Sequence, residues 1–273
     1  MSVRIVLAQL GSTDDKQLNL QKARDAIGKS VDVYGSDMVV FPEVYMSHFP
    51  AGTPHDVVKA DSEPLDGRFV TSMCELAQKH NTWLVFGMRE STEDADDDRV
   101  YNTTVMVDSN GSIVGSYRKT HLYDAFGAKE SEHIKPGDHL FDPVDTPFGK
   151  IGMFVCYELR FPEIARYQAI QGADIIIVPS GWVRGPLKEH HWKTLVTARA
   201  LENTLFVAAC DQVSDHYCGN SLVVDPMGVH MATGSEVETL IPCEIDLSRV
   251  ADVRRKLPSS IHRRPELYGR SFV

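Results

Sequence analysis

Short apolar segments of strand length alternate with segments of helical periodicity along most of this chain. Six runs rich in Val and Ile are nearly continuous rather than alternating, which is typical of strands buried on both faces. They lie at residues 4–9, 37–43, 83–88, 150–156, 174–180 and 205–210. Segments of helical period precede four of these runs, at residues 15–31, 67–81, 161–172 and 188–203. This order predicts an α/β fold.

Two further segments have the pattern of β-hairpins, so the strand order is mixed. In residues 99–119, two alternating runs flank a turn at Ser109–Ser112, and residues 221–234 turn at Asp225–Gly228. The chain contains no Pro/Ser-rich linker. We therefore predict one domain over residues 1–273, with two packed sheets, helices outside, and a charged C-terminal arm from about residue 249.

Composition and charge exclude several classes of partner. The chain is 42% hydrophobic and 24% charged, as in ordinary globular proteins, and its net charge of −10 argues against phosphate-mediated binding of nucleic acid. Its apolar runs are too short to cross a membrane or to form a signal sequence. Five scattered cysteines without CxxC pairs suit free thiols in a reducing compartment. These features predict a cytoplasmic protein without nucleic-acid or membrane partners.

Cys156 is the first candidate for chemistry, because it ends an apolar run and is followed at once by charges. If residues 150–156 form a strand and Pro162 opens a helix, Cys156 lies at a strand-to-helix elbow. Helix dipoles there would favour the nucleophilic thiolate. Local sequence alone leaves open that Cys156 is a buried apolar residue. Cys74 and Cys210 are better explained as core, and Cys218 as a semi-exposed loop residue.

A cysteine nucleophile needs a base, and a carboxylate fits better than a histidine. His121, His190 and His191 would make a papain-like pair with Cys156, but none follows a strand as Cys156 does. Glu43 does, since an apolar run leads into it, and partial burial there would raise its pKa. A cation, Lys119, similarly ends an alternating run. Taken singly, both residues are also ordinary on a protein surface.

Together, these residues and their neighbours resemble the Glu–Lys–Cys triad of the carbon–nitrogen hydrolases of the nitrilase superfamily. The matching motifs are "FPEVY" around Glu43, "YRKTHLYD" around Lys119 and "CYELRFPE" around Cys156. The resemblance implies a second glutamate before a "PGD" turn, which is Glu130 in "KESEHIKPGD", with Glu132 as the close competitor. The similar region runs from about residue 3 to residue 268.

The resemblance carries expectations about fold, reaction and assembly. It implies a four-layer α-β-β-α sandwich, in which two mixed sheets lie between helical layers. It also implies that Glu43 deprotonates Cys156 and that a thioester forms, while Lys119 and the Tyr157 N–H stabilise the oxyanion. A carboxylic acid and ammonia are then released, without a metal or other cofactor. Family members associate through the helices beside the nucleophile, so a homo-oligomer is expected.

The substrate is expected to be a small amide. Nitrile-cleaving relatives usually have Trp-Glu after the cysteine, whereas this chain has Tyr157 and Glu158, and its motifs most resemble ω-amidases, which act on dicarboxylic half-amides. N-carbamoyl amines, nitriles and a non-catalytic scaffold remain alternatives. Residues 46–58 are expected at the pocket mouth. Arg160 would bind a carboxylate or, as we favour, pair with Glu158. The candidate substrate-binding residues are Tyr45, Tyr157, Glu158, Arg160 and Trp182.

Overall fold

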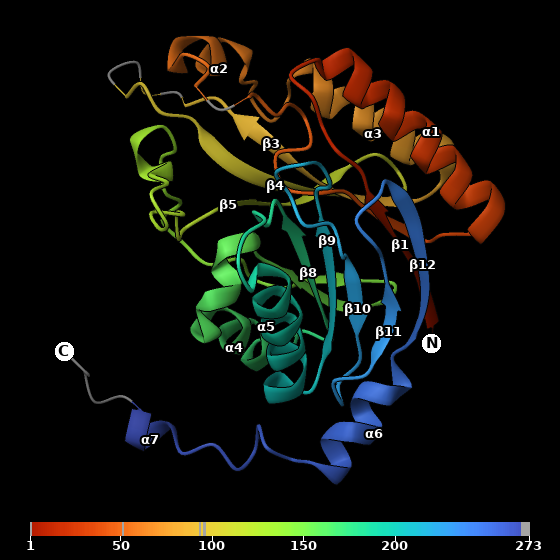
Figure 1. Ribbon diagram of the computed structural model, residues 1–273. Helices are drawn as coiled ribbons and strands as arrows, with labels where there is room; N and C mark the ends of the chain where they lie inside the picture. Colours follow the sequence, from red (N-terminus) through yellow and green to blue (C-terminus); the bar gives the residue numbers. More distant parts are fainter. Residues whose placement is uncertain (1, 51, 93, 95–96, 269–273) are drawn as a thin grey trace.

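Two mixed β-sheets face each other at the centre of the protein, with helices on their outer sides (Figure 1). The computed structural model describes residues 2–50, 52–92, 94 and 97–268. Over these residues each sheet has six strands, and β1 of one sheet packs over β9 of the other. The expected four-layer α-β-β-α sandwich is confirmed.

The first sheet has the strand order β12-β1-β2-β3-β4-β5. Strands β1, β2 and β3 are parallel, and the other neighbouring strands pair antiparallel. The strands are β1 (Ser2–Gln9), β2 (Met38–Val40), β3 (Trp83–Glu90), β4 (Tyr101–Val107), β5 (Ile113–Arg118) and β12 (Thr239–Asp246). The β4–β5 hairpin turns where the sequence predicts it.

The second sheet has the order β11-β10-β9-β8-β7-β6, with β7, β8 and β9 parallel. Its strands are β6 (Val144–Thr146), β7 (Gly149–Met153), β8 (Ile175–Ser180), β9 (Phe206–Asp211), β10 (Leu222–Val224) and β11 (His230–Thr233). The predicted hairpin turn at Asp225–Gly228 joins β10 to β11, and Gly228 takes the positive φ that this turn requires.

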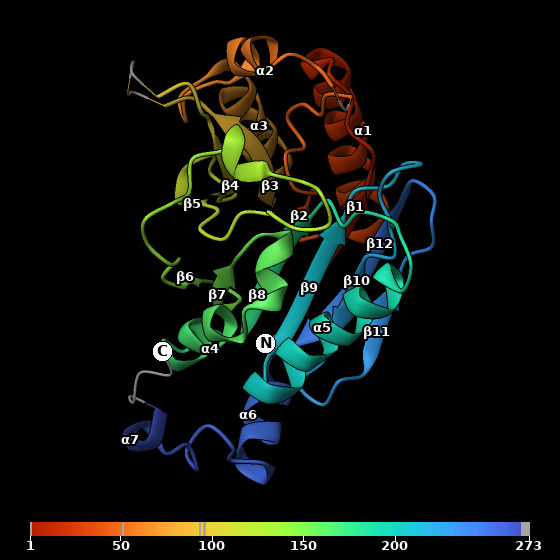
Figure 2. The same ribbon diagram turned by 60° about the vertical axis from the view of Figure 1, so that its left-hand side comes forward.

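Helices cover the outer face of each sheet, as the view in Figure 2 makes clear. Helix α1 (Lys16–Tyr34) packs beside α3 (Arg68–His80) on the first sheet, and α4 (Pro162–Ile170) packs beside α5 (Lys188–Asn203) on the second. The remaining helices are α2 (His55–Asp61), α6 (Ser248–Lys256), α7 (Pro265–Tyr268) and the 3₁₀ turns η1 (Glu130–Glu132) and η2 (Cys156–Arg160).

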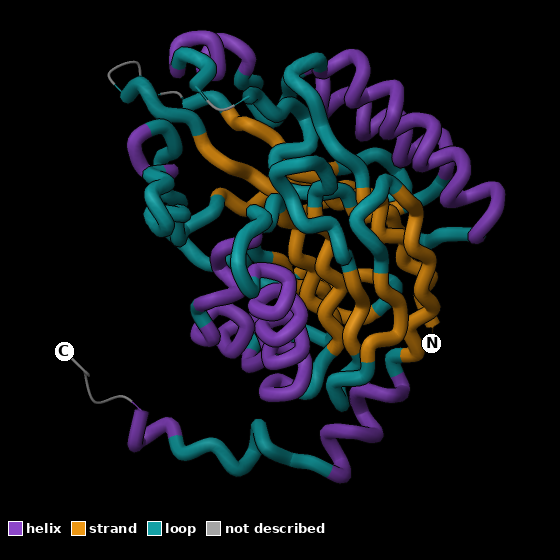
Figure 3. The backbone as a smooth tube through the Cα atoms, in the orientation of Figure 1, coloured by secondary structure: helices purple, strands orange, loops and turns teal. Residues whose placement is uncertain are grey.

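The nearly continuous apolar runs are explained by burial on both faces of each strand. In β2, Met38 and Val40 belong to the core between the sheets, whereas Val39 packs in the core beneath α1 and α3. Because successive side chains of a strand point to opposite faces, both positions must be apolar. The tube in Figure 3 shows the resulting arrangement, with all strands inside and helices outside.

Two of the predicted strands end earlier than their apolar runs. Strand β2 ends at Val40 and β7 ends at Met153, so Glu43 and Cys156 lie in the segments that follow. Pro42 lacks the N–H needed to continue a ladder, and its carbonyl instead accepts a hydrogen bond from Gly87. Both side chains are thereby placed beyond the carboxyl ends of parallel strands, where open α/β sheets form their sites.

The described part of the C-terminal arm leaves the body of the protein through α6 and continues to α7 (Figure 1). Residues 269–273 of the expected arm lie outside the described residues. Among the helices of the described part of the chain, none combines the length and apolar character that a membrane span requires.

Candidate active site

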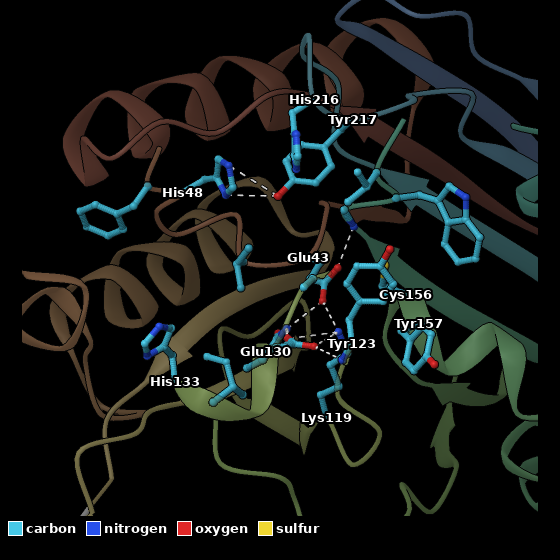
Figure 4. Close-up of a pocket in the computed structure, with 18 of the residues that line it drawn as sticks. Glu43, His48, Lys119, Tyr123, Glu130, His133, Cys156, Tyr157, His216 and Tyr217 are labelled. Atoms are coloured by element: carbon cyan, nitrogen blue, oxygen red, sulfur yellow. Dashed lines mark hydrogen bonds and ion pairs between the residues drawn. The ribbon is translucent and has the colours of Figure 1, made fainter. Parts of the chain in front are cut away.

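A cavity of about 400 Å³ opens where the carboxyl ends of the central strands of both sheets meet (Figure 4). Glu43, Lys119, Glu130 and Cys156, which are far apart in the sequence, all line it. Glu43 and Lys119 follow β2 and β5 of the first sheet, and Cys156 follows β7 of the second. The four residues that the sequence motifs single out are therefore brought to one place.

Glu43 is buried and held from several sides. Its Oε1 accepts hydrogen bonds from Lys119 Nζ at 2.9 Å and Asn102 Nδ2 at 2.7 Å, and its Oε2 accepts one from the Gly181 N–H at 2.7 Å. Its backbone carbonyl accepts a bond from the Gln212 side chain at 2.8 Å. Since Gly181 and Gln212 directly follow β8 and β9 of the second sheet, both sheets fix this carboxylate.

Lys119 is 2% exposed and lies between two carboxylates. Its Nζ donates to Glu43 Oε1 and to Glu130 Oε2, each at 2.9 Å. Burial alone would lower the pKa of Lys119, but the charges of Glu130 and Glu43 raise it well above its usual value. Lys119 is therefore a permanent point charge in the cavity.

Glu130, and not Glu132, is the second glutamate of the site. Besides Lys119, it accepts a hydrogen bond from the Tyr123 N–H at 2.6 Å. Glu132 instead pairs with Lys129 on the surface, at 3.1 Å. The glutamate that the six-residue step to the "PGD" turn favours is thus the one that contacts Lys119.

Asn102 bridges the two carboxylates, and sequence reasoning missed it. Its Nδ2 donates to Glu43 Oε1 at 2.7 Å and to Glu130 Oε1 at 3.2 Å. Asn102 lies near the start of β4 and is buried. An amide in a strand that is otherwise apolar and rich in Thr is the sequence feature that could have pointed to it.

Cys156 opens η2 with a positive φ of 46°, and Val44, next to Glu43, has φ 45°. Such values are strained for residues with side chains, most of all for β-branched Val, and strain of this kind concentrates at functional sites. Pro162 begins α4, as the sequence predicts. The elbow differs from the expected one because the 3₁₀ turn η2 separates Cys156 from α4.

The resting protonation state is a thiol beside a carboxylate. Burial, followed by the negative charge of Glu43, raises the pKa of Cys156 well above its usual value, so the expected stabilised thiolate is wrong. Burial also acts to raise the pKa of Glu43, but the charge of Lys119 and the hydrogen bonds from Lys119 and Asn102 outweigh it and lower that pKa. The expectation of a raised pKa for Glu43 is therefore also wrong. An ionised carboxylate next to a neutral thiol is the arrangement that general-base chemistry needs.

The three histidines that were weighed as the base lie away from the cavity. Within the described residues, none of His121, His190 and His191 lines the cavity. His121 instead lies 3.5 Å from Glu158, outside the cavity. The carboxylate whose charge raises the pKa of the Cys156 thiol is Glu43, which lines the same cavity.

Tyr45 and Glu158 do not line the cavity, so their expected contact with substrate is corrected. The Tyr45 side chain is fully buried below β2 and donates to the Asn19 carbonyl at 3.0 Å. Glu158 accepts hydrogen bonds from Tyr117 at 2.7 Å and from the Val155 N–H at 2.8 Å. Both residues hold the backbone around the site rather than facing into it. Cys218 is also buried, not semi-exposed.

Tyr157, Arg160 and Trp182 do line the cavity, together with His48, Phe49 and His55 of the expected pocket mouth. The favoured pairing of Arg160 with Glu158 is wrong, because Glu158 bonds other partners. The Arg160 guanidinium lies 4.8 Å from the Trp182 ring centre, and its buried Nε and Nη2 have no hydrogen-bond partner.

Three further cations that line the cavity were not predicted: Lys129, Lys188 and Arg89. Lys188 of α5 is buried, donates to the Tyr123 hydroxyl at 3.2 Å and lies 4.0 Å from the Phe126 ring centre. Arg89 lies near the end of β3, and its buried Nε has no hydrogen-bond partner. A charge directly after an apolar run was the signal for Arg89, and it is the same signal that pointed to Glu43.

Similarity to known proteins agrees with the motifs. The family model described as carbon-nitrogen hydrolase matches residues 4–255. The deaminated glutathione amidase of Mus musculus is 37% identical over 279 residues, which cover 97% of this chain and 84% of the mouse protein. The described residues contain no group of three or more His, Cys, Asp or Glu side chains arranged for a metal ion.

Solved structures of related proteins have the same fold. The NitFhit protein of C. elegans superposes with a TM-score of 0.86 at 34% identity, covering 98% of this chain and 66% of that longer one. A carbon-nitrogen hydrolase from Helicobacter pylori gives a TM-score of 0.89 at 25% identity, covering 98% and 97%. The chain therefore belongs to the carbon-nitrogen hydrolase family, and it is an amidase-type enzyme of the nitrilase superfamily.

Proposed function

We propose that this protein hydrolyses the carbon–nitrogen bond of a small anionic amide, with Cys156 as the nucleophile. The observation that carries the proposal is that the Cys156 thiol, the buried Glu43 carboxylate and the Lys119 ammonium, which donates to Glu43 at 2.9 Å, all line one cavity. Nucleophile, base and electrophile are then all within one site.

The first half-reaction forms a thioester. Glu43 takes the thiol proton as sulfur attacks the carbonyl carbon, and the carbonyl oxygen becomes an oxyanion next to Lys119 and the Tyr157 N–H. One such preorganised donor typically lowers the barrier by roughly 3–4 kcal/mol. The tetrahedral intermediate then collapses, its C–N bond breaks, and Glu43 returns the proton to the departing nitrogen.

The second half-reaction releases the acid. Glu43, ionised again, takes a proton from water, which attacks the thioester carbon. The C–S bond breaks and Cys156 recovers its proton. Glu130 keeps Lys119 in position throughout, since its two oxygens bond the same ammonium group.

The charges of the cavity support an anionic substrate. Two carboxylates and five cations are among its described lining residues, although the whole chain carries a net charge of −10. Lys119 is paired with the two carboxylates, but among the described residues Arg160 has no carboxylate partner, and Lys188 donates to a hydroxyl. Arg160 and Lys188 both lie beside Trp182.

We propose that Arg160 and Lys188 bind a carboxylate of the acyl group, which agrees with a half-amide substrate. The deaminated glutathione amidases among the relatives favour the same class.

The test is the release of acid from a panel of amides by the wild type and by Cys156→Ala. We expect hydrolysis of half-amides such as glutaramate, slower hydrolysis of the neutral butyramide, and none by Cys156→Ala. Trapping of a glutaryl thioester on Cys156, detected by mass spectrometry of the wild type quenched in acid soon after mixing with substrate, would identify the intermediate. If no amide is hydrolysed by the wild type, the proposal fails. Cys243→Ala, which changes a cysteine away from the cavity, is the matched control.

A further inference from the structure

Asp211 is a fully buried acid that takes no part in the proposed proton transfers. It is the last residue of β9. Its Oδ1 accepts a hydrogen bond from the Trp182 N–H at 2.6 Å, whereas its Oδ2 has no hydrogen-bond partner among the described residues. A buried carboxyl group with one oxygen unpaired is costly to ionise, so this environment favours the uncharged acid.

The titratable groups around Asp211 favour the uncharged acid as well. Within the described residues they are a carboxylate, three thiols and a phenol, namely Glu43 after β2, Cys156 after β7, Cys210 on β9, and Tyr217 and Cys218 in the loop after β9. None of these groups can supply a positive charge. Burial, to which the charge of Glu43 adds, raises the pKa of Asp211 well above its usual value, although the hydrogen bond from Trp182 acts in the opposite direction.

Two consecutive backbone N–H groups connect Asp211 to the catalytic carboxylate. Strand β8 ends at Ser180, which is opposite Asp211 in the parallel pair of β8 and β9. The next two residues are Gly181, which donates its N–H to Glu43 Oε2 at 2.7 Å, and Trp182, which donates its N–H to Asp211. Since a single Cα joins these two planar peptide groups, the direction of one N–H limits the direction of the other.

Asp211 is a fixed anchor for a segment that has little stiffness of its own. Gly181 has no side chain that could restrict the rotation of the two peptide groups, so their hydrogen bonds set their directions. The backbone of Asp211 is held in turn, because its N–H donates to Ser221 Oγ at 2.8 Å. The side chain of Asp211 therefore restrains the N–H that Glu43 receives from Gly181.

Other contacts hold the far side of Trp182. Its carbonyl accepts a hydrogen bond from the Cys218 N–H, and its indole Nε1 donates to the Lys188 carbonyl, each at 2.9 Å. These contacts do not involve the Asp211 side chain. We therefore expect a substitution of Asp211 to loosen the Gly181 end of the segment while Trp182 stays in the cavity wall.

We propose that Asp211 is a positioning residue for the hydrolysis, which keeps the Gly181 N–H directed at the Glu43 carboxylate and does so as the uncharged acid. This inference rests on the proposed function, since it takes Glu43 as the base. An uncharged Asp211 adds no second negative charge beside the base, so Glu43 stays the ionised member of the two acids.

The test is the pH dependence of kcat/KM for glutaramate in Asp211→Leu and Asp211→Asn. Asp211→Leu has no acceptor for the Trp182 N–H. We expect the acid limb to move up by about one pH unit and kcat/KM at neutral pH to fall by about 10-fold, as for one weakened hydrogen bond to Glu43. Asp211→Asn keeps an acceptor in the same place without a charge, so its acid limb should coincide with that of the wild type and its kcat/KM should stay within about 2-fold.

Asp225→Leu is the matched control, because Asp225 is also a buried acid that accepts backbone hydrogen bonds. Its Oδ1 accepts from the Met227 and Val229 N–H groups in the turn between β10 and β11, and it does not line the cavity. Asp225→Leu should unfold at a lower urea concentration than the wild type and keep the wild-type acid limb. Equal shifts of the acid limb in both Leu variants would show that a loosened fold causes them, and would overturn the positioning role.

The uncharged state has a test that needs no turnover. With its raised pKa, folded Asp211 keeps a proton that the unfolded chain releases above about pH 4. The resulting stability is complete below that pH and is lost as the pH rises towards the folded pKa, whereas Asn has no such loss. The urea midpoint of Asp211→Asn should therefore rise relative to that of the wild type between pH 5 and pH 8. A constant difference between the two midpoints would refute the uncharged state.

Failure of this inference differs from failure of the proposed function. If the wild type hydrolyses glutaramate and Asp211→Leu keeps the wild-type acid limb, the positioning role is refuted while the hydrolase stands. If Asp211→Leu does not fold, Asp211→Asn decides, since a loss of more than about 10-fold in its kcat/KM contradicts the proposal. If the wild type hydrolyses no amide, the positioning role is refuted together with the proposed function, and the urea comparison still decides the charge of Asp211.

Discussion

At the residue scale, the site depends on how the charge of Glu43 is maintained in a buried cavity. Three donors satisfy its carboxylate, and Lys119 supplies the charge that outweighs burial. Removing one donor should weaken this balance without removing any reacting atom.

Asn102→Leu should raise the pKa of Glu43, because the carboxylate loses the hydrogen bond to Nδ2. The base is active only when ionised, so the acid limb of the pH profile of kcat/KM should move to higher pH. We expect kcat/KM at neutral pH to fall by about 10-fold. Thr104→Val, on the same face of β4 and without a hydrogen-bond partner to lose, is the control. An unshifted acid limb in Asn102→Leu would show that Asn102 does not position Glu43.

His48 should make stability fall in mildly acidic solution. Burial, then the charges of Arg89 and His216, lower the pKa of His48 to about 4, with Glu43 acting weakly in the opposite direction. The unfolded chain binds this proton near pH 6.5 and the folded chain only near pH 4, so stability is lost as the pH falls between these values.

Urea unfolding at pH 7.5 and pH 5.0 measures this loss. His48→Gln should remove roughly 1–2 kcal/mol of the pH-dependent decrease in unfolding free energy. His262→Gln, at an exposed position of the C-terminal arm, should leave the decrease as it is. Equal decreases in wild type and His48→Gln would contradict the assignment.

At the element scale, the position of Glu43 depends on a close approach between β3 and the segment after β2. A Cβ added at Gly87 would lie 2.3 Å from the Val44 nitrogen and 2.8 Å from the Glu43 carbonyl carbon. No side chain fits there, so Gly87 fixes how near the catalytic segment comes to the sheet.

Gly87→Ala should therefore displace Glu43 and lower kcat by about 10- to 100-fold, since small misplacements of reacting groups are costly. Gly28→Ala is the contrasting variant, because the new Cβ in α1 would only meet His80 at 3.7 Å. It should raise stability by roughly 0.5–1 kcal/mol with unchanged kcat. A normal kcat for Gly87→Ala would show that the segment with Glu43 and Val44 accommodates the added Cβ without displacing Glu43.

The elements were predictable to the extent that they follow local periodicity. The buried runs around Val39 and Ile176 and both hairpin turns could be placed from sequence, as could Glu43, Lys119 and Cys156, because known motifs surround them. The ends of β2 and β7 could not be predicted from the apolar runs. Pro42 and the 3₁₀ turn at Cys156 end these strands although the apolar residues continue. Asn102 and Arg89 reach the cavity only because distant segments fold together. No motif in the neighbouring sequence marks them as the motifs mark Glu43, Lys119 and Cys156.

At the scale of the whole molecule, one face carries apolar side chains that this chain alone leaves exposed. Leu201 of α5 contacts the turn at Gly228, and Thr197 bonds His230 at 2.8 Å, so α5 and the β10–β11 hairpin form one surface. Met227, Val229 and Met231 of this surface are between 42% and 54% exposed. The homo-oligomer that the family resemblance implies remains a prediction, and this surface is where we expect it to form.

Val229→Glu with Met231→Glu should convert the oligomer to a monomer, because two desolvated charges in each subunit oppose association. Sedimentation velocity of wild type and the double variant measures this. Val33→Glu, on the exposed side of α1, is the control and should sediment like the wild type. A wild type that is monomeric at micromolar concentration would refute the prediction.

The pairing of β12 with β1 has a consequence for synthesis of the chain. Residues 239–246 cover the open edge of residues 2–9 along the full length of both strands. On the ribosome, residues 2–9 are made long before residues 239–246, so the nascent polypeptide carries an unpaired, apolar strand until the covering strand has emerged. We therefore expect a chaperone to bind residues 2–9 during synthesis and to leave only when residues 239–246 have emerged.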